Sequence, residues 1–216
     1  MKISSETLNL LKSFTSINPS IYVNKGNSIR TISPQKTVLA QAELDDKFKK
    51  PFGIYDLNQF LSAVSLFEEP EFEFNDNDVE IKNGASSLTY RFADKNMIMQ
   101  PPEKEITLPD VVVEFSLTEQ VLRKSLQAAS TLGLPNWSVV GDGSKIYIVV
   151  SDMKNESGNQ FRYEVGETDQ VFDLSFKTEN LKFIPTEYNV KISSKGISHF
   201  VTNDAKVQYW IATESR

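Results

Sequence analysis

Residues 52–67, FGIYDLNQFLSAVSLF, change from a strand-like to a helix-like hydrophobic period. Phe52 and Ile54 alternate as in a half-buried strand, and Asp56 can then cap a helix by accepting backbone N–H bonds. The apolar residues that follow at one-face helical spacing are Leu57, Phe60, Leu61, Val64 and Phe67. The opposite face carries polar but uncharged residues, namely Asn58, Gln59, Ser62 and Ser65. Because a solvated helix face usually carries charge, this face is predicted to meet something other than bulk water.

A second amphipathic pattern opens the chain. Ser4 or Ser5 can cap a helix that ends at Asn18-Pro19. Its predicted apolar face consists of Leu8, Leu11, Phe14 and Ile17, and its outer face includes Asn9 and Lys12. The other elements predicted for this half are a hairpin of residues 21–23 and 28–32, a strand at 37–44, a charged loop at 45–50, and an antiparallel meander of 72–74, 79–82 and 88–92.

Residues 94–110, DKNMIMQPPEKEITLPD, differ from both flanking segments. They hold three prolines, no glycine and no sustained hydrophobic period. Such a composition is typical of an extended connector. We therefore predict a first domain at 1–93, a connector at 94–110 and a second domain at 111–216.

The second half begins with a predicted strand, 111–115, followed by a helix that carries the capping box Ser116-Leu117-Thr118-Glu119. Leu117, Val121, Leu122, Leu126, Ala129 and Leu132 form its predicted apolar side, and Gln120, Arg123, Lys124, Gln127 and Thr131 form a basic outer face. The remaining predicted elements are strands at 139–140, 145–150, 161–165 and 172–176, a short helix at 178–184, and strands at 188–192, 197–201 and 207–212.

Both halves therefore have the same order: helix, strands, a strand leading into a helix, and three closing strands. FGIYDLNQFL in the first half corresponds to VFDLSFKTENL in the second, and LTYRFA corresponds to VQYWIA. The spacing of about 115 residues is longer than that of solenoid repeats. The pattern predicts two copies of one α+β domain.

Composition narrows the possible functions. The chain has 216 residues, 39% of them hydrophobic and 24% charged, which is typical of a globular protein. It has no cysteine, which excludes disulfides and thiolate catalysis, and its one histidine excludes metal sites built on several histidines. We find neither a signal peptide nor an apolar run long enough to span a membrane, so the prediction is a cytoplasmic protein.

No catalytic or metal-binding motif emerges. Gly141-Asp142-Gly143-Ser144 lacks both the later glycine and the Lys-Ser/Thr ending of a phosphate-binding loop. The acidic turn at 76–80 lacks the glycine and distal glutamate of a calcium loop, which favours a plain hairpin. His199 lies in a predicted strand without a nucleophile elbow nearby, which favours a structural or surface role. We therefore predict no cofactor, no metal and no catalytic residue.

The charges are unevenly distributed. The whole chain carries a net charge of −6, which argues against binding nucleic acid through a general positive field. The predicted helices nevertheless sum to +2, from Lys2, Lys12, Arg123, Lys124, Lys177 and Lys182 against Glu6, Asp56, Glu119 and Glu179. A lone polar helix face is usually solvated surface, whereas four such faces in duplicated positions also fit a nucleic-acid surface. Both interpretations stay open at this point.

The segments FGIYDLNQFLSAVSLF and MKISSETLNLLKSFTSIN resemble the sliding clamp of T4-type bacteriophages, the DNA polymerase processivity factor. The similarity in element order extends over essentially the whole chain. The resemblance implies an α+β fold of duplicated DNA-clamp domains, three subunits closed head to tail into a homotrimeric ring, sheets on the outside and helices lining a central hole. It also implies sequence-independent binding of double-stranded DNA, a phage DNA polymerase and an ATP-driven clamp loader as partners, and the host cell cytoplasm as the location.

The resemblance also implies two sets of site residues. The side chains expected to face DNA are Lys2, Asn9, Lys12, Asn58, Gln59, Ser62, Gln120, Arg123, Lys124, Gln127, Lys177 and Lys182. The residues expected in a partner-peptide pocket are Ile32, Ile98, Met99, Pro185, Trp210 and Ala212. For Trp210 a core position is the alternative, since Tyr209 and Trp210 must point to opposite faces of their strand.

A head-to-tail ring needs complementary strand edges. We predict that the subunit interface uses two edge strands, through Ser87, Leu88, Tyr90 and Phe92 in the first domain and Phe161, Tyr163 and Val165 in the second. Two competing functions remain at this stage. One is a monomeric, β-rich structural or interaction protein that does not encircle DNA, and the other is an enzyme of unrecognised chemistry.

Overall fold

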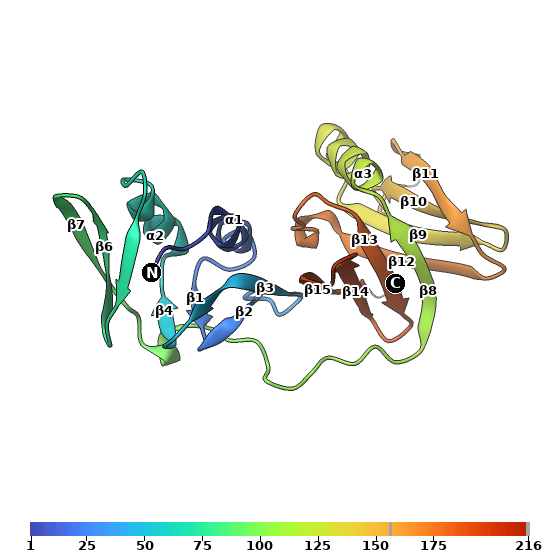
Figure 1. The fold of residues 1–216 in the computed structure, drawn as a ribbon. Helices are drawn as coiled ribbons and strands as arrows, with labels where there is room; N and C mark the ends of the chain where they lie inside the picture. The colour runs from blue at the N-terminus through green and yellow to red at the C-terminus, as the bar shows by residue number, and fades with distance from the viewer. Residues whose placement is uncertain (156, 215–216) are drawn as a thin grey trace. The chain divides into compact units, whose positions relative to one another are not determined.

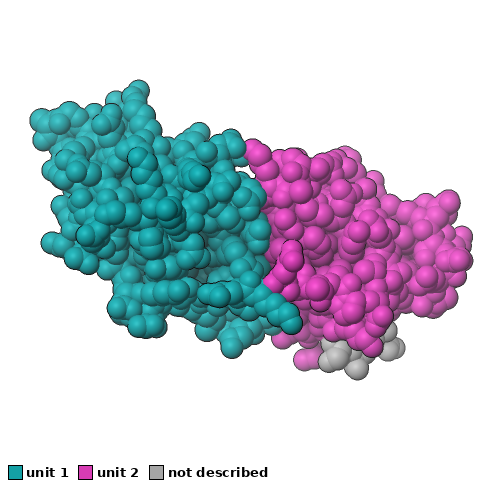
Figure 2. Space-filling view, turned by 60° about the horizontal axis from the view of Figure 1, so that its bottom comes forward, with its two compact units in different colours: residues 1–104 teal, residues 105–216 magenta. Residues whose placement is uncertain are grey.

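A computed structural model describes residues 1–155 and 157–214 of the chain. It divides into two compact units, unit 1 (residues 1–104) and unit 2 (residues 105–216), which Figure 2 shows in different colours. The division falls inside the predicted connector 94–110. Among the described residues, none of the helices has the length and apolar character needed to cross a membrane.

Unit 1 contains two α-helices and three small groups of antiparallel strands (Figure 1). β1 pairs with β4, β2 pairs with β3, and β5, β6 and β7 form a meander. The elements are α1 (Ser5–Phe14), β1 (Ile21–Val23), β2 (Gly26–Ile32), β3 (Val38–Phe48), β4 (Phe52–Ile54), α2 (Leu57–Val64), β5 (Glu71–Phe74), β6 (Asp78–Asn83), β7 (Ser86–Arg91) and a 3-10 turn, η1 (Lys95–Met97). The predicted meander is confirmed.

The predicted hairpin of residues 21–23 and 28–32 is wrong. β1 instead pairs with β4 along its whole length, because both strands are short and bury Ile21 and Val23 with Phe52 and Ile54. β2 finds its partner in β3, a strand of 11 residues. The turn residues between β1 and β2 favoured pairing of these two strands, whereas the burial of apolar side chains favours pairing of β1 with the more distant β4.

The charged loop predicted for residues 45–50 is also wrong as far as Phe48, because β3 continues through it. Phe48 is only 1% exposed, and its ring lies 5.1 Å from that of Phe52 and 5.7 Å from that of Phe74. The Asp46 carboxylate accepts hydrogen bonds from the backbone N–H and the hydroxyl of Ser4, at 2.8 and 2.7 Å. The charged residues of this segment thus belong to a strand that also anchors the start of α1.

Both helices of unit 1 begin at the predicted caps. Ser4 accepts a hydrogen bond from the N–H of Thr7, and Asp56 accepts one from the N–H of Gln59. The apolar face of α1 differs from the prediction, because its buried residues are Thr7, Leu10, Leu11 and Phe14, whereas Leu8 is only half-buried. α1 packs against both β3 and α2, so its buried side is wider than one stripe.

The described part of unit 2 consists of two antiparallel sheets and one α-helix (Figure 1). One sheet has the strand order β11-β10-β9-β12, and in the other β8, β13, β14 and β15 pair in that order. The elements are β8 (Val111–Leu117), α3 (Glu119–Leu132), β9 (Asn136–Asp142), β10 (Lys145–Ser151), β11 (Phe161–Glu167), β12 (Val171–Lys177), a 3-10 turn, η2 (Thr178–Asn180), β13 (Tyr188–Ser193), β14 (Ile197–Thr202) and β15 (Val207–Ala212). α3 packs against β9, β10 and β11.

The cap of α3 is Thr118, which accepts a hydrogen bond from the N–H of Val121, and the predicted capping box at Ser116 is wrong. Strand β8 extends two residues further than expected, because its ladder with β13 pairs Ser116 with Asn189 and Leu117 with Tyr188. Leu117 is fully buried in that ladder rather than on the helix.

The helix predicted at 178–184 is reduced to η2. The backbone groups of Ile184 bond elsewhere: its N–H donates to the Tyr209 hydroxyl at 3.2 Å, and its carbonyl accepts from the Tyr188 hydroxyl at 2.6 Å. Both tyrosines are fully buried. Burial raises the pKa of Tyr209 to about 12, and burial raises that of Tyr188 as well, so both hydroxyls keep their protons at neutral pH. Hydrogen bonds to core tyrosines thus replace the helical bonds that the prediction assigned to Ile184.

The duplication is visible in matching backbone contacts. The N–H of Leu57 at the start of α2 donates to the carbonyl of Pro19 at 2.8 Å, and the N–H of Thr178 at the start of η2 donates to that of Pro135 at 2.9 Å. In each unit the acceptor proline follows the first helix, and the donor follows a strand that pairs with the strand just after that proline, β4 with β1 and β12 with β9. The α+β class of antiparallel sheets with few helices is confirmed.

Candidate functional site

The polar residues predicted to face DNA in unit 1 lie at or near two helices that pack against each other, α1 and α2. Asn9 and Lys12 are exposed on α1, and Asn58, Gln59 and Ser62 are exposed on α2. Lys2 precedes α1 and is also exposed. The structure therefore brings together the helices that carry these side chains.

In unit 2 the corresponding residues divide between a helix and a turn. Gln120, Arg123, Lys124 and Gln127 are exposed on α3, as predicted. The other two predicted cations are not on a helix: Lys177 ends β12, and Lys182 follows η2. The hydroxyl of Thr178 lies 3.3 Å from the carbonyl oxygen of Leu134, so η2 sits beside the C-terminal end of α3.

A shallow groove of about 370 Å³ separates α3 from η2. Its lining residues are Leu126, Ala129, Ser130, Gly133, Leu134, Pro135, Thr178 and Glu179. The sequence did not indicate this groove, because the hydrogen bonds of Ile184 that replace the predicted helix depend on tertiary packing.

Ion pairing separates the six predicted cations into two groups. Lys2 pairs with Glu69 at 2.9 Å, Arg123 with Glu119 at 2.6 Å and Lys177 with Glu214 at 3.9 Å. By contrast, Lys12, Lys124 and Lys182 form no ion pair within residues 1–155 and 157–214. Exposed ion pairs are weak, at about 0–1 kcal/mol, so an incoming phosphate can compete with the paired acid. The three unpaired lysines meet no such competition.

The two strands predicted at the subunit interface are both sheet edges. Along the part of the chain that the structure describes, β7 pairs with β6 alone and β11 pairs with β10 alone. Tyr90 of β7 donates its hydroxyl toward the carbonyl of Asp56 at 3.1 Å and the side-chain oxygen of Gln59 at 3.2 Å. Tyr163 of β11 is 36% exposed. Each edge therefore offers unpaired backbone groups beside aromatic side chains.

A hollow of about 550 Å³ adjoins the edge strand β7. It is lined by Tyr55, Asp56, Gln59, Thr89, Tyr90, Arg91, Phe92, Ala93 and Met97. Tyr55 and Met97 are 60% and 62% exposed. The prediction for this edge missed both residues, although an aromatic Tyr55 directly before a helix cap and an apolar Met97 in a polar connector were the available signals.

The residues predicted for the partner-peptide pocket belong to both units. In unit 1, Ile32 is buried, Ile98 is 4% exposed and Met99 is 41% exposed. A side chain at Gly53 would meet the Ala93 carbonyl at 2.6 Å and Ile98 Cδ1 at 2.8 Å, so glycine at this position lets the start of the connector lie directly on β4.

In unit 2, Pro185 is exposed, and Trp210 and Ala212 are half-buried. Tyr209 takes the core position on β15, where it is fully buried. Trp210 points to the opposite face and stacks on the His199 ring, with the ring centroids 4.7 Å apart and the planes inclined by 11°. The alternative of a core Trp210 is therefore wrong.

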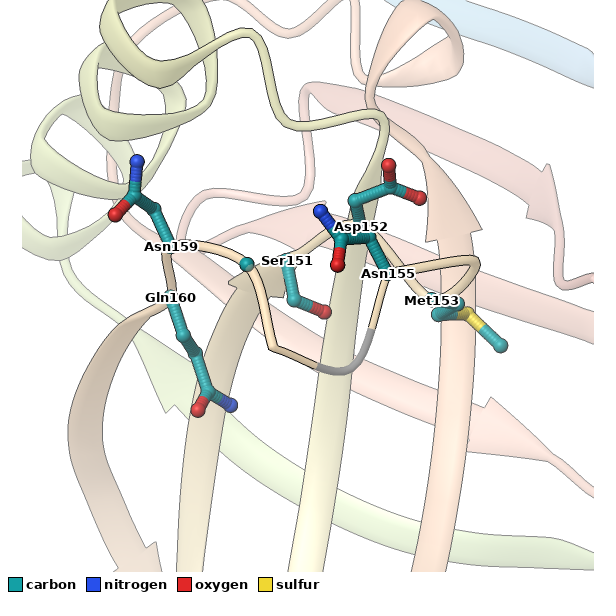
Figure 3. Close-up of a pocket in the computed structure, with 7 residues that line it drawn as sticks. Ser151, Asp152, Met153, Asn155, Asn159 and Gln160 are labelled. Atoms are coloured by element: carbon teal, nitrogen blue, oxygen red, sulfur yellow. The ribbon is translucent and has the colours of Figure 1, made fainter.

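A polar cavity of about 420 Å³ lies in the loop between β10 and β11 (Figure 3). It is lined by Ser151, Asp152, Met153, Asn155, Gly158, Asn159 and Gln160. Amide and carboxylate groups dominate this lining, and much of their hydrogen bonding is local, as in the Lys154 N–H bond to Asp152 at 2.9 Å. Across the described residues there is no group of three or more His, Cys, Asp or Glu side chains that could hold a metal ion.

The two halves of the chain each match a family model of known proteins. Residues 4–100 match a family model described as DNA polymerase processivity factor, and residues 114–215 match one described as gp45 sliding clamp, C terminal. The sliding clamp of Vibrio phage KVP40 is 33% identical over 223 residues, which cover 100% of both chains. The chain belongs to the T4-type phage sliding-clamp family.

Further relatives agree with the assignment to this clamp family. The sliding clamp of Escherichia phage RB69 is 28% identical over 223 residues, with 100% of this chain and 97% of the relative covered. The fold also resembles a chain in the solved structure of A. fulgidus PCNA with the C-terminal region of FEN-1 bound, at a TM-score of 0.74 and 12% identity, covering 100% of this chain and 97% of that one. The function of this clamp chain is that of a sliding clamp, a DNA polymerase processivity factor.

Proposed function

We propose that three copies of this chain close into a ring around double-stranded DNA and tether the phage replicative polymerase. In this proposal a separate, ATP-driven loader opens the ring, the chain itself is not an enzyme, and the host cytoplasm is its place of work. The observation that carries the proposal is the contrast between a net charge of −6 and helix faces on which Lys12 and Lys124 stand without an acidic partner among the described residues.

The helix faces fit loose contact with a phosphate backbone. Long lysine side chains on α1 and α3 reach phosphates without fixing a register, and amides such as Asn58 and Gln59 on α2 donate hydrogen bonds without adding charge. A surface of this kind binds DNA regardless of sequence and lets it slide. The acidic remainder of the chain repels DNA, which keeps the duplex in contact with the helix faces alone.

The unpaired edges of β7 and β11 fit head-to-tail closure. Adding one edge to the other supplies backbone hydrogen bonds between unlike surfaces, which is the heterologous contact that a closed ring needs. Leu88 and Tyr90 stand opposite the buried residues Ile81 and Val79 of β6. Their side chains therefore lie on the apolar side of the sheet edge, where a neighbouring strand would cover them.

The partner-binding proposal rests on two apolar side chains outside the core. Met99 in unit 1 is exposed and Trp210 in unit 2 is half-buried, and both are of types that contribute strongly to peptide binding. Ile98 is buried against Gly53 and would act by fixing the connector that carries Met99.

Retention on circular DNA tests the ring directly. The clamp is loaded with its loader and ATP onto a nicked circular plasmid, the complex is isolated by gel filtration, and the plasmid is then cut with a restriction enzyme. A ring held by topology stays on the circle and runs off the linear product, whereas a protein held by ordinary contacts stays on both. Sedimentation in parallel should give a species of about three times the 24.4 kDa subunit mass. A strict monomer at high concentration would favour the alternative of a non-encircling interaction protein.

A further inference from the structure

Four residues directly opposite one another form a row across one face of the sheet β8, β13, β14 and β15. They are Glu114, Lys191, His199 and Trp210, one from each strand in that order. Lys191 pairs with Glu114 at 3.2 Å, and His199 stacks on Trp210 at 4.7 Å. Within unit 2 the row therefore includes an aromatic stack, and one of its two members, Trp210, is the residue proposed to bind partners.

The imidazole of His199 is fixed from two directions. Its Nε2 atom lies 2.9 Å from the side-chain oxygen of Gln208, which lies on β15 two residues before Trp210. In the neutral ring, Nε2–H donates to that oxygen and Nδ1 carries no proton. The ring plane is then set nearly parallel to the indole, at 11°. Stacked aromatic pairs of this kind stabilise their arrangement beyond the area that they bury.

We propose that His199 is a positioning residue, which holds the indole of Trp210 against the sheet so that an apolar partner peptide meets an ordered ring. The inference rests on the proposed role of Trp210 in partner binding. An ordered tryptophan loses little rotamer freedom when a peptide docks, so preorganisation increases affinity without any new contact.

The charged surroundings make this stack sensitive to pH. The groups that face His199 within unit 2 are Lys191 from β13, itself paired with Glu114 of β8, and Gln208 and Trp210 from β15. Burial lowers the pKa of His199, and the positive charge of Lys191 lowers it further, whereas the hydrogen bond to Gln208 raises it. When the pKa of a histidine is lower in the folded state than its unfolded-state value of about 6.5, the neutral ring stabilises the fold fully at pH values above 6.5. This stabilisation is lost as the pH falls through the lower, folded-state pKa.

Tryptophan emission of the full-length clamp tests the stack. Protonated imidazole in contact with indole quenches its fluorescence, so we expect wild-type emission to fall on acidification with a midpoint below the usual histidine value. His199→Gln should remove this pH dependence and increase quenching of Trp210 by acrylamide. His199→Phe should restore the protection from acrylamide without restoring the pH dependence. Subtracting the emission of Trp210→Phe from that of the wild type gives the emission of Trp210 alone, without that of the buried Trp137. Equal acrylamide quenching in wild type and His199→Gln would overturn the inference.

Calorimetric titration with a synthetic peptide of the last residues of the same phage's DNA polymerase tests the consequence. His199→Gln should increase the Kd for the peptide about two- to tenfold, which is the change expected from the loss of one aromatic pair. His199→Phe should recover most of the lost affinity. If Trp210→Ala leaves the affinity unchanged, the proposed partner role fails, while the emission data still decide the stack. If Trp210→Ala weakens binding and His199→Gln does not, the positioning role of His199 is refuted.

Discussion

Reversing the charge of Arg123 and Lys124 should impair DNA retention far more than folding. Both side chains are exposed on α3, away from its buried residues. Arg123→Glu removes the ion pair with Glu119 and places two acids four residues apart. Each of these effects costs about 0.3–0.5 kcal/mol on an exposed helix, so the loss of folding stability should stay near 1 kcal/mol per subunit.

The effect on DNA binding follows from counterion release. Each phosphate contact contributes about 0.9 to the slope of log K against log salt. If Lys124 makes one phosphate contact per subunit in a trimer, the loss of all three contacts lowers the slope by about 2.7. Over a fourfold change in salt concentration, the DNA affinity of the variant should then change by a factor about 40-fold smaller than that of the wild type. Lys124→Glu alone should cause most of the defect, because Lys124 has no ion pair in the described chain whereas Arg123 is tied to Glu119.

The assay is processive synthesis and clamp retention on primed circular DNA at several salt concentrations. The defect should grow as salt falls, because screening hides the repulsion at high ionic strength. Lys25→Glu is the matched control, since Lys25 is an exposed lysine outside the helices, in the turn before β2. Lys82 suits this purpose less well, because it bridges Glu73 and Glu80. Wild-type processivity of the α3 reversals at low and moderate salt would refute the claim that α3 faces DNA.

Three further predictions concern assembly, partner binding and acid stability. Tyr163→Pro should remove a donor from the edge strand β11 and shift the trimer toward monomer in sedimentation; an unchanged trimer would contradict the interface assignment. Trp210→Ala combined with Met99→Ala should weaken peptide binding while the ring stays assembled, and wild-type affinity in a peptide titration would argue against the partner site. Partial burial opposes ionisation of Asp46, but hydrogen bonds from the side chain of Thr7 and from Ser4 outweigh it and hold the pKa of Asp46 below its usual value. The ionised Asp46 therefore stabilises the fold above its unfolded-state pKa of about 3.9, and this contribution is lost as the pH falls through its folded-state pKa. Asp46→Asn should accordingly make the free energy of unfolding, measured in urea, less dependent on pH between pH 5 and pH 3. A pH profile identical to that of the wild type would exclude this role.

Several features of the site were readable from local sequence. The caps Ser4 and Asp56, the polar face of α2 and the basic face of α3 all appeared where the hydrophobic period placed them. Such features depend on neighbours within one or two helical turns, so the sequence pattern contains the physics that decides them. The meander β5-β6-β7 was predictable for the same reason, since tight turns link strands that are adjacent in the chain.

Other features depended on contacts between distant residues. The end of β3 at Phe48 is set by a cluster of phenylalanine rings from three strands, and the loss of the predicted helix at 178–184 follows from hydroxyl bonds of Tyr188 and Tyr209 to Ile184. Neither partner set is visible in a local window of sequence. Tertiary hydrogen bonds of this kind override helix propensity, which is worth less than about 1 kcal/mol per residue.

The amino-acid sequence alone therefore determined the duplicated α+β pattern, the basic face of α3 and, through two long segments, the resemblance to phage clamps. Only the tertiary structure decided which of the predicted cations form ion pairs within residues 1–155 and 157–214, because the partners Glu69 and Glu214 of Lys2 and Lys177 are distant in the chain. It likewise decided that Tyr209 rather than Trp210 enters the core, since alternation fixes that the two diverge but only packing fixes which one is buried.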